Sequence, residues 1–111
     1  MTPLHWAAGN GLISFVKILI KIGAQVNAPD YRNDTPLLYA VSRGHSDVVE
    51  YLVQNGADVN RKGSYYHPIL MAIIREHIDI AEFLAQKGAD VPTVTPNDEY
   101  LLHYVCKHGL L

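Results

Sequence analysis

The sequence predicts an all-α solenoid made of stacked helix–turn–helix units. Three observations lead to this fold class. Segments of the chain align with one another at a spacing of 32 or 33 residues, and most of them open with a signal for the start of a helix. The first three also carry a glycine placed to end a second helix. A unit this short cannot bury its own apolar face, so neighbouring units must stack.

The repeat is visible in direct self-comparison. Residues 2–27, TPLHWAAGNGLISFVKILIKIGAQVN, align with residues 35–60, TPLLYAVSRGHSDVVEYLVQNGADVN, after a shift of 33. Residues 67–92 follow after a shift of 32, and residues 100–111, YLLHYVCKHGLL, after another 33. We therefore expect one domain over 1–111, with repeats at approximately 2–34, 35–66, 67–99 and a partial copy at 100–111.

The first helix of each unit has an expected start. Thr2 and Thr35 are N-cap residues, whose hydroxyls satisfy a free backbone N–H of the first turn. Proline follows at the first helical position, where its missing N–H costs nothing, at Pro3, Pro36 and Pro68. In the first two copies a glycine, Gly11 or Gly44, then allows a tight turn into the second helix.

The second helix carries apolar residues at helical spacing. In the first copy these residues are Ile13, Val16, Leu19 and Ile20, and in the second they are Val48, Val49, Leu52 and Val53. A glycine in the left-handed conformation is expected just after each helix, at Gly23, Gly56 and Gly88. Ser46 and Asp47 are expected in the first turn of a helix, where the helix dipole favours them.

These motifs together resemble the ankyrin repeat. The resemblance is carried by TPLHWA (2–7), TPLLYA (35–40), NGADVN (55–60) and KGAD (87–90), and it covers essentially the whole chain. It implies helix pairs whose connecting loops project at right angles as β-hairpin fingers. It also implies a non-enzymatic module that binds another protein on a concave surface of fingers and first helices. The histidine of the TPLH motif, His5, is implied to tie a finger to a helix through hydrogen bonds.

Carried onto this chain, the resemblance identifies candidate partner-binding positions. The finger positions are Tyr31, Arg32, Asp34, Ser64, Tyr65, Tyr66, Pro96, Asn97 and Glu99. The exposed first-helix positions include Ser42, Arg43, Ile74, Arg75, Lys107 and His108. Tyrosines and a basic stripe suggest a groove for an extended acidic or aromatic-containing segment of a partner. The alternatives are that the tyrosines pack against neighbouring fingers and that the basic residues form a merely solvated face.

Some residues depart from the family pattern. Glu76 replaces the inter-helix glycine of the third copy, and His67 replaces its capping threonine. Asn33 fills a finger position at which the family usually has glycine, and asparagine tolerates the left-handed conformation. Apolar residues also lie near both ends, which predicts self-association through uncapped end faces, at Leu4, Ile13, Phe15, Leu110 and Leu111.

No constellation in the sequence favours catalysis, a metal or a cofactor. His103, Cys106 and His108 supply at most three ligands, whereas a structural zinc site needs about four. Cys106 aligns with Ala8 and is better explained as a buried apolar position. The run His45–Asp47 contains the residue types of a catalytic triad, but adjacent helical positions point in different directions.

Composition narrows the function further. The net charge is −2 with neutral histidines, which argues against nucleic acid as a partner, and no segment is long and apolar enough for membrane insertion. A single cysteine and the absence of a signal-peptide pattern predict a cytoplasmic location. Two alternative functions remain open: a structural spacer segment of a longer array, and a host-directed effector of an intracellular microbe.

Overall fold

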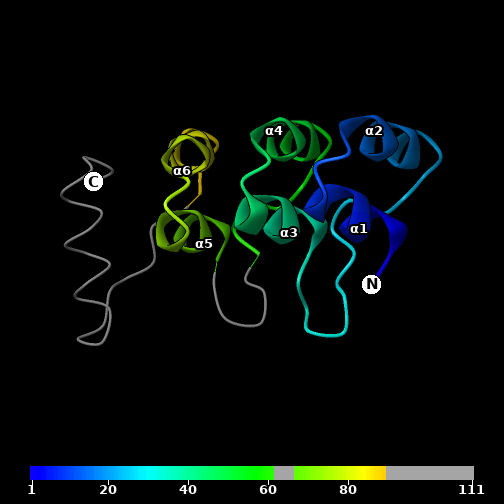
Figure 1. Cartoon of the computed structure of the whole chain (residues 1–111), viewed down its shortest axis with the longest axis horizontal. Helices are drawn as coiled ribbons and strands as arrows, with labels where there is room; N and C mark the ends of the chain where they lie inside the picture. Colours follow the sequence, from blue (N-terminus) through cyan, green and yellow to red (C-terminus); the bar gives the residue numbers. More distant parts are fainter. Residues whose placement is uncertain (62–66, 90–111) are drawn as a thin grey trace.

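The computed structural model describes residues 1–61 and 67–89, which form six helices arranged as three pairs. Figure 1 shows α1, α3 and α5 side by side in one layer and α2, α4 and α6 in a second layer. The helices are α1 (Pro3–Gly9), α2 (Ile13–Lys21), α3 (Pro36–Arg43), α4 (Ser46–Gln54), α5 (Pro68–Ile74) and α6 (Ile78–Gln86). We call the three successive pairs units 1, 2 and 3. The predicted all-α solenoid is confirmed.

The first helices begin where the capping residues predict. The Thr2 and Thr35 hydroxyls each accept a hydrogen bond, at 3.4 Å, from the backbone N–H three residues later. Proline occupies the first turn of α1, α3 and α5. His67, which replaces the threonine in unit 3, makes no such side-chain cap. Unit 3 therefore keeps the proline signal and loses the hydroxyl that stabilises the first turn.

The expected left-handed residues are also present. Gly23, Gly56 and Gly88 have positive φ angles of 102°, 97° and 90°. Asn33 and Glu76 adopt positive φ as well, at 66° and 61°. Glu76 thus keeps the backbone conformation of the inter-helix glycine, although a side chain is strained there. The unit geometry imposes this conformation on a residue that does not favour it.

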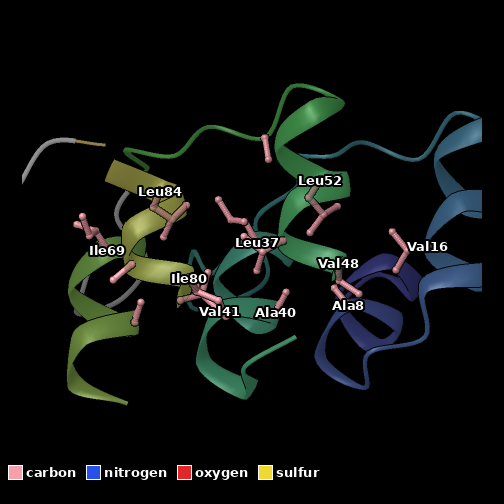
Figure 2. Close-up of a cluster of buried hydrophobic side chains, with 14 of the residues drawn as sticks. Ala8, Val16, Leu37, Ala40, Val41, Val48, Leu52, Ile69, Ile80 and Leu84 are labelled. Atoms are coloured by element: carbon pink, nitrogen blue, oxygen red, sulfur yellow. The ribbon is translucent and has the colours of Figure 1, made fainter. Parts of the chain in front are cut away.

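The core runs continuously through the three units. Figure 2 shows Val48 of unit 2 beside Ala8 of unit 1, and Ile80 of unit 3 beside Val41 of unit 2. Leu37 and Leu52 are fully buried within unit 2. Full burial of a side chain of this size contributes roughly 1.5–3 kcal/mol. Because the core also brings together side chains of different units, as at Val48 and Ala8, each unit depends on its neighbour for stability.

Histidines at the starts of the second helices add polar links between units. His45 Nε2 lies 3.1 Å from the Gly9 carbonyl oxygen, and His77 Nε2 lies 3.4 Å from the Ser42 carbonyl oxygen. A carbonyl can only accept, so Nε2 carries the proton in both rings. Each imidazole thereby satisfies a carbonyl near the end of the preceding unit's first helix, where intrahelical partners run out.

One sequence expectation about the start of the chain needs correction. Leu4 is 1% exposed and belongs to the hydrophobic core, so it is not part of an outward-facing apolar surface. Ile13 is half-buried, whereas Phe15 is exposed as expected. The expected Leu110 and Leu111 lie outside the described residues. The exposed apolar surface of unit 1 is therefore formed by Phe15 together with Trp6, Ile18 and Ile22.

Candidate protein-interaction surface

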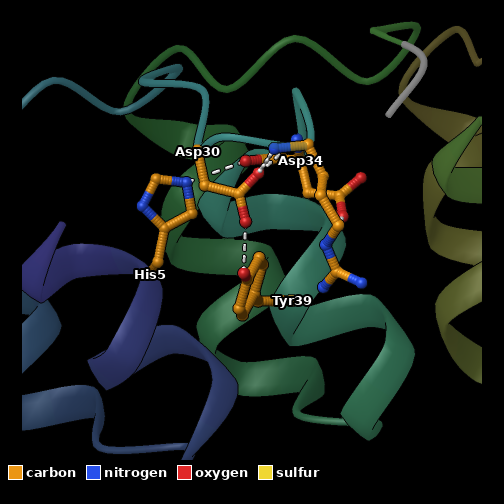
Figure 3. Close-up of polar contacts among 5 residues, drawn as sticks. His5, Asp30, Asp34 and Tyr39 are labelled. Atoms are coloured by element: carbon orange, nitrogen blue, oxygen red, sulfur yellow. Dashed lines mark hydrogen bonds and ion pairs between the residues drawn. The ribbon is translucent and has the colours of Figure 1, made fainter. Parts of the chain in front are cut away.

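The loop between α2 and α3 is organised around the carboxylate of Asp30. Asp30 Oδ1 accepts hydrogen bonds from the backbone N–H groups of Arg32, at 2.8 Å, and Asp34, at 2.9 Å. Its Oδ2 accepts a hydrogen bond from the Tyr39 hydroxyl of α3 (Figure 3). The Asp30 N–H donates to the Asp34 carbonyl at 2.9 Å, which closes the turn. We call residues 28–34 finger 1; it is a closed turn with no assigned strand.

A histidine of the preceding helix fixes finger 1 from the other side. His5 Nε2 donates to the Asp34 carbonyl oxygen at 2.8 Å, and its Nδ1 accepts from the Thr2 N–H at 3.1 Å. The imidazole is fully buried and meets the Tyr39 ring edge-on, with ring centroids 5.1 Å apart. The structural role implied for His5 is confirmed, since this side chain links α1 to the finger.

The Asp30 carboxylate is held in its charged form. Burial alone would raise its pKa, but the hydrogen bonds from the Tyr39 hydroxyl and the two backbone N–H groups outweigh it and lower the pKa below the ordinary value. Burial and donation to Asp30 raise the pKa of Tyr39 in turn. Asp30 is therefore an anion at neutral pH whose hydrogen bonds define the shape of finger 1.

The tip of finger 1 presents two side chains to solvent. Tyr31 is 84% exposed, and the Arg32 guanidinium carbon lies 5.5 Å from the centroid of its ring. Arg32 Nε also approaches Asp34 Oδ2 at 3.7 Å. The Asp34 side chain is only 17% exposed, so this residue supports the tip more than it offers a free surface. The structure thus brings together all three candidate positions of finger 1.

The predicted first-helix positions differ in accessibility. Arg43 ends α3 and Arg75 follows the last residue of α5, and both side chains are exposed at equivalent places in units 2 and 3. Ser42 is half-buried, and its carbonyl accepts the His77 hydrogen bond. Ile74 is 38% exposed. Arginine side chains therefore recur at equivalent places in units 2 and 3, as the sequence alignment predicts, whereas unit 1 has Asn10 there.

Comparison with known protein families is consistent with this arrangement. A family model described as "Ankyrin repeats (3 copies)" matches residues 1–63, and a second, "Ankyrin repeats (many copies)", matches residues 47–85. The first match alone covers more than half of the chain. The chain belongs to the ankyrin-repeat family. Ankyrin repeats form a protein–protein interaction fold, so this general class of function follows from membership.

Several curated proteins share part of the chain. A probable E3 ubiquitin-protein ligase of Oryza sativa subsp. japonica is 38% identical over 60 residues, which is 54% of this chain and 12% of the ligase. Alpha-latrotoxin-Lh1a of Latrodectus hasselti is 47% identical over 58 residues, 52% of this chain and 4% of the toxin. Protein phosphatase 1 regulatory subunit 27 of Homo sapiens is 40% identical over 58 residues, 52% of this chain and 38% of that protein. The chain thus matches well under half of each of these relatives.

Several other candidate positions lie outside the described residues. They are the finger positions Ser64, Tyr65, Tyr66, Pro96, Asn97 and Glu99, and the stripe positions Lys107 and His108. The set His103, Cys106 and His108, weighed as metal ligands, also lies there. Within 1–61 and 67–89, no three histidine, cysteine or acidic side chains are grouped to hold a metal ion. Within these same two ranges, no helix is long and apolar enough to cross a membrane.

The role of Asp30, whose hydrogen bonds hold finger 1 in shape, was not predicted from the sequence. The available signal was local: an aspartate that bonds the backbone N–H two residues later is a common turn device. The contact with Tyr39, nine residues away, has no comparable local signal. Asp30 could therefore be predicted as a turn residue but not as the anion that joins the turn to α3.

Proposed function

We propose that this ankyrin domain binds an extended segment of a partner protein that carries acidic and aromatic side chains. The segment would lie across a concave surface, which we define by Tyr31, Arg32, Arg43 and Arg75. The observation that carries the proposal is the fixed shape of finger 1, which exposes Tyr31 and Arg32 at its tip. A tip held in place before binding loses little conformational entropy when it meets a partner.

The chemistry of these side chains favours an acidic and aromatic partner. Tyrosine and arginine are enriched among the residues that dominate interface energies, because each combines a large contact area with hydrogen-bonding groups. Tyr31 offers a ring face and edge for stacking against an aromatic side chain. The guanidinium groups of Arg43 and Arg75 can form paired hydrogen bonds with carboxylates.

The repeat also suggests a spacing for the partner's acidic residues. Packed helices lie about 8–10 Å apart, and an extended segment in the polyproline II conformation advances about 3.1 Å per residue with three residues per turn. A segment that crosses the first helices of units 2 and 3 therefore advances about three residues per unit, and side chains at this spacing point to the same side. We propose that its carboxylates lie three residues apart, so that successive ones meet Arg43 and Arg75.

The relatives support recognition rather than catalysis as the role of the shared segment. Their names describe a probable ligase, a toxin and a regulatory subunit, and each matches about half of this chain at 38%, 47% and 40% identity. A segment common to proteins of such different kinds is better suited to contacting partners than to one reaction. For this chain, we propose only the chemical character of the partner segment, and we base it on the side chains of the concave surface.

The test is a binding titration with a designed probe. The probe is a fluorescently labelled extended peptide with one tyrosine and glutamates three residues apart, and binding is followed by fluorescence anisotropy. The double variant Arg43→Glu/Arg75→Glu should lose binding, and the affinity of the native chain should fall as salt is raised. The matched control is Lys21→Glu/Lys87→Glu, which changes the net charge equally at exposed positions at the ends of the second helices.

Three outcomes would contradict the proposal. The first is a native chain that does not bind the probe, and the second is equal binding by the two double variants. The third is equal binding of a peptide whose glutamates lie two residues apart. Circular dichroism of each variant verifies that the helices are retained, so that a loss of binding reports on the surface itself.

A further inference from the structure

An arginine of the next loop reaches back to finger 1. Arg61 lies in the loop after α4, and its Nη1 donates to the Asn27 carbonyl oxygen at 3.1 Å. Its Nη2 donates to Oδ1 of Asn33 at 3.3 Å. Asn27 comes just before finger 1 and Asn33 lies near its end, so one planar guanidinium joins the two sides of the loop. Figure 1 shows this loop projecting from the row formed by α1, α3 and α5.

The repeat pattern does not supply this contact. Arg61 aligns with Ala28 of the first copy, whose side chain has no hydrogen-bonding group. Asn33 stands where the family usually has glycine, and it keeps the left-handed conformation at φ 66°. The link between Arg61 and Asn33 is therefore a feature of this chain and not of the repeat.

The contact fixes the orientation of the Asn33 side-chain amide. A guanidinium can only donate, so the atom that faces it must be the carbonyl oxygen of that amide. The Nδ2 group is thereby turned away from Arg61, and it has no acceptor within residues 1–61 and 67–89. Because the Asn33 side chain is exposed, its Nδ2 group is open to an acceptor on another molecule.

The backbone of finger 1 offers a partner fewer donors. The N–H groups of Arg32 and Asp34 donate to the Asp30 carboxylate. Those of Asp30 and Asn33 donate to carbonyl oxygens of the finger, each at 2.9 Å. An extended partner segment has no internal hydrogen bonds, so its carbonyls lose water contacts where they approach the tip. Such carbonyls need a donor from the protein surface, and the Asn33 amide is placed to supply one.

We propose that Asn33 is a further partner-binding residue, which donates from Nδ2 to a main-chain carbonyl of the partner segment, and that Arg61 is its positioning residue. This inference rests on the function proposed above and deepens it. Tyr31, two residues before Asn33, reads a side chain of the segment, whereas Asn33 reads its backbone. Because Arg61 orients the amide before binding, the hydrogen bond costs little conformational entropy when it forms.

A direct contact between Arg61 and a partner carboxylate is the competing arrangement. Arg61 is half-buried, and both of its Nη atoms donate to groups of finger 1 or just before it. Arg32 and Arg43, by contrast, are exposed. The described contacts therefore favour a positioning role for Arg61, and the two arrangements differ in the salt dependence they predict.

The role of Asn33 is tested with a double-mutant cycle between the chain and the labelled probe peptide described above. Each carbonyl oxygen of the peptide is replaced in turn by sulfur, which is a weaker acceptor and leaves the charge unchanged. One replacement should weaken binding to the native chain about two- to tenfold, the range of one hydrogen bond. The same replacement should have no effect on the Asn33→Gly variant, which keeps the left-handed turn and lacks the amide.

The role of Arg61 is tested with two variants. Arg61→Ala should weaken binding about two- to tenfold and speed hydrogen exchange at the amides of Arg32 and Asn33, because finger 1 loses a link. The salt dependence of its affinity should match that of the native chain, since no ionic contact with the partner is lost. Arg61→Lys is the matched control: it keeps the charge without the planar fork, so it should not restore binding.

Three outcomes would overturn this inference and leave the proposed function intact. The first is a native chain that binds the probe with no carbonyl coupled to Asn33, and the second is native affinity in Arg61→Ala. The third is full binding by Arg61→Lys together with a weaker salt dependence in Arg61→Ala, which would make Arg61 a direct ligand. A native chain that binds none of the peptides contradicts the proposed function itself, and this inference with it.

Discussion

A Cβ atom on Gly11 would lie 2.6 Å from Nδ1 of His45, so the imidazole of unit 2 occupies space that only glycine leaves open in unit 1. The same relation holds between Gly44 and His77, at 2.7 Å from Cε1. In the sequence the two residues are also absent together. Unit 3 has Glu76 in place of the inter-helix glycine, and the copy that follows it has Leu110 in place of the histidine. The inter-helix glycine and the histidine of the next unit therefore occur together, because the histidine ring needs the space that glycine leaves open.

The first prediction concerns that pairing. Gly11→Ala should destabilise the chain by about 2–3 kcal/mol, because it adds the clash with His45 to the strain of a residue at φ 70°. Gly23→Ala should cost only about 1–2 kcal/mol, because its Cβ would enter open space and only the backbone is strained. Urea denaturation measures both values.

A double-mutant cycle isolates the contact between the two residues. In the His45→Ala background the cost of Gly11→Ala should fall to that of Gly23→Ala, since the ring that produces the clash is gone. An undiminished cost in that background would show that His45 does not determine the glycine requirement.

The second prediction concerns Glu76. Because this residue adopts φ 61°, Glu76→Gly should stabilise the chain, and the gain should be about 0.5–1 kcal/mol after the added flexibility of the unfolded state is subtracted. Asn33→Gly is the matched control. Asparagine tolerates the left-handed conformation, so the thermal midpoint should change less there than at Glu76.

The third prediction concerns pH. The folded pKa of Asp30 is lowered, so its charged hydrogen bonds stabilise the fold above the ordinary carboxyl pKa of about 3.9. This stability is lost as the pH falls from there through the lowered folded pKa. Asp30→Asn should cost about 1.5–3 kcal/mol at neutral pH and make stability less dependent on pH in that acidic range.

Controls for Asp30 come from its own partner and from an exposed carboxylate. Tyr39→Phe removes one donor and should move the Asp30 pKa back towards its ordinary value, which an NMR titration of the carboxyl carbon measures. Glu82→Gln on α6 should leave the acid dependence unchanged. An Asp30→Asn variant with the acid dependence of the native chain would contradict the assignment.

The fourth prediction concerns His5. His5→Leu replaces the imidazole with an apolar side chain of similar size and removes the donor to the Asp34 carbonyl. The substitution should lower the free energy of unfolding by about 1 kcal/mol. Hydrogen exchange at the amides of Arg32 and Asn33 should become faster, because the finger loses its link to α1. The amides of α4 serve as an internal reference; equal acceleration there would indicate general destabilisation instead.

The sequence alone determined the helical units and their boundaries. Thr35 and Pro36 specify a helix start, and Gly56 specifies a helix end, through interactions within a few residues of each. The alignment also identified Tyr31, Arg43 and Arg75 as candidate surface positions, and the structure shows all three exposed. Local rules suffice here because caps, turns and amphipathic spacing act over one helical turn.

The tertiary structure decided which side chains meet across units. His45 lies on Gly11 and bonds the Gly9 carbonyl, 36 residues earlier, and no rule of local spacing encodes that contact. Likewise, Phe15 and Val48 occupy equivalent sequence positions, yet only Val48 has a neighbouring unit to bury it. The burial of a side chain and its hydrogen bonds to another unit depend on whether a unit packs beside it. For the described residues, these contacts are set by the assembled helices.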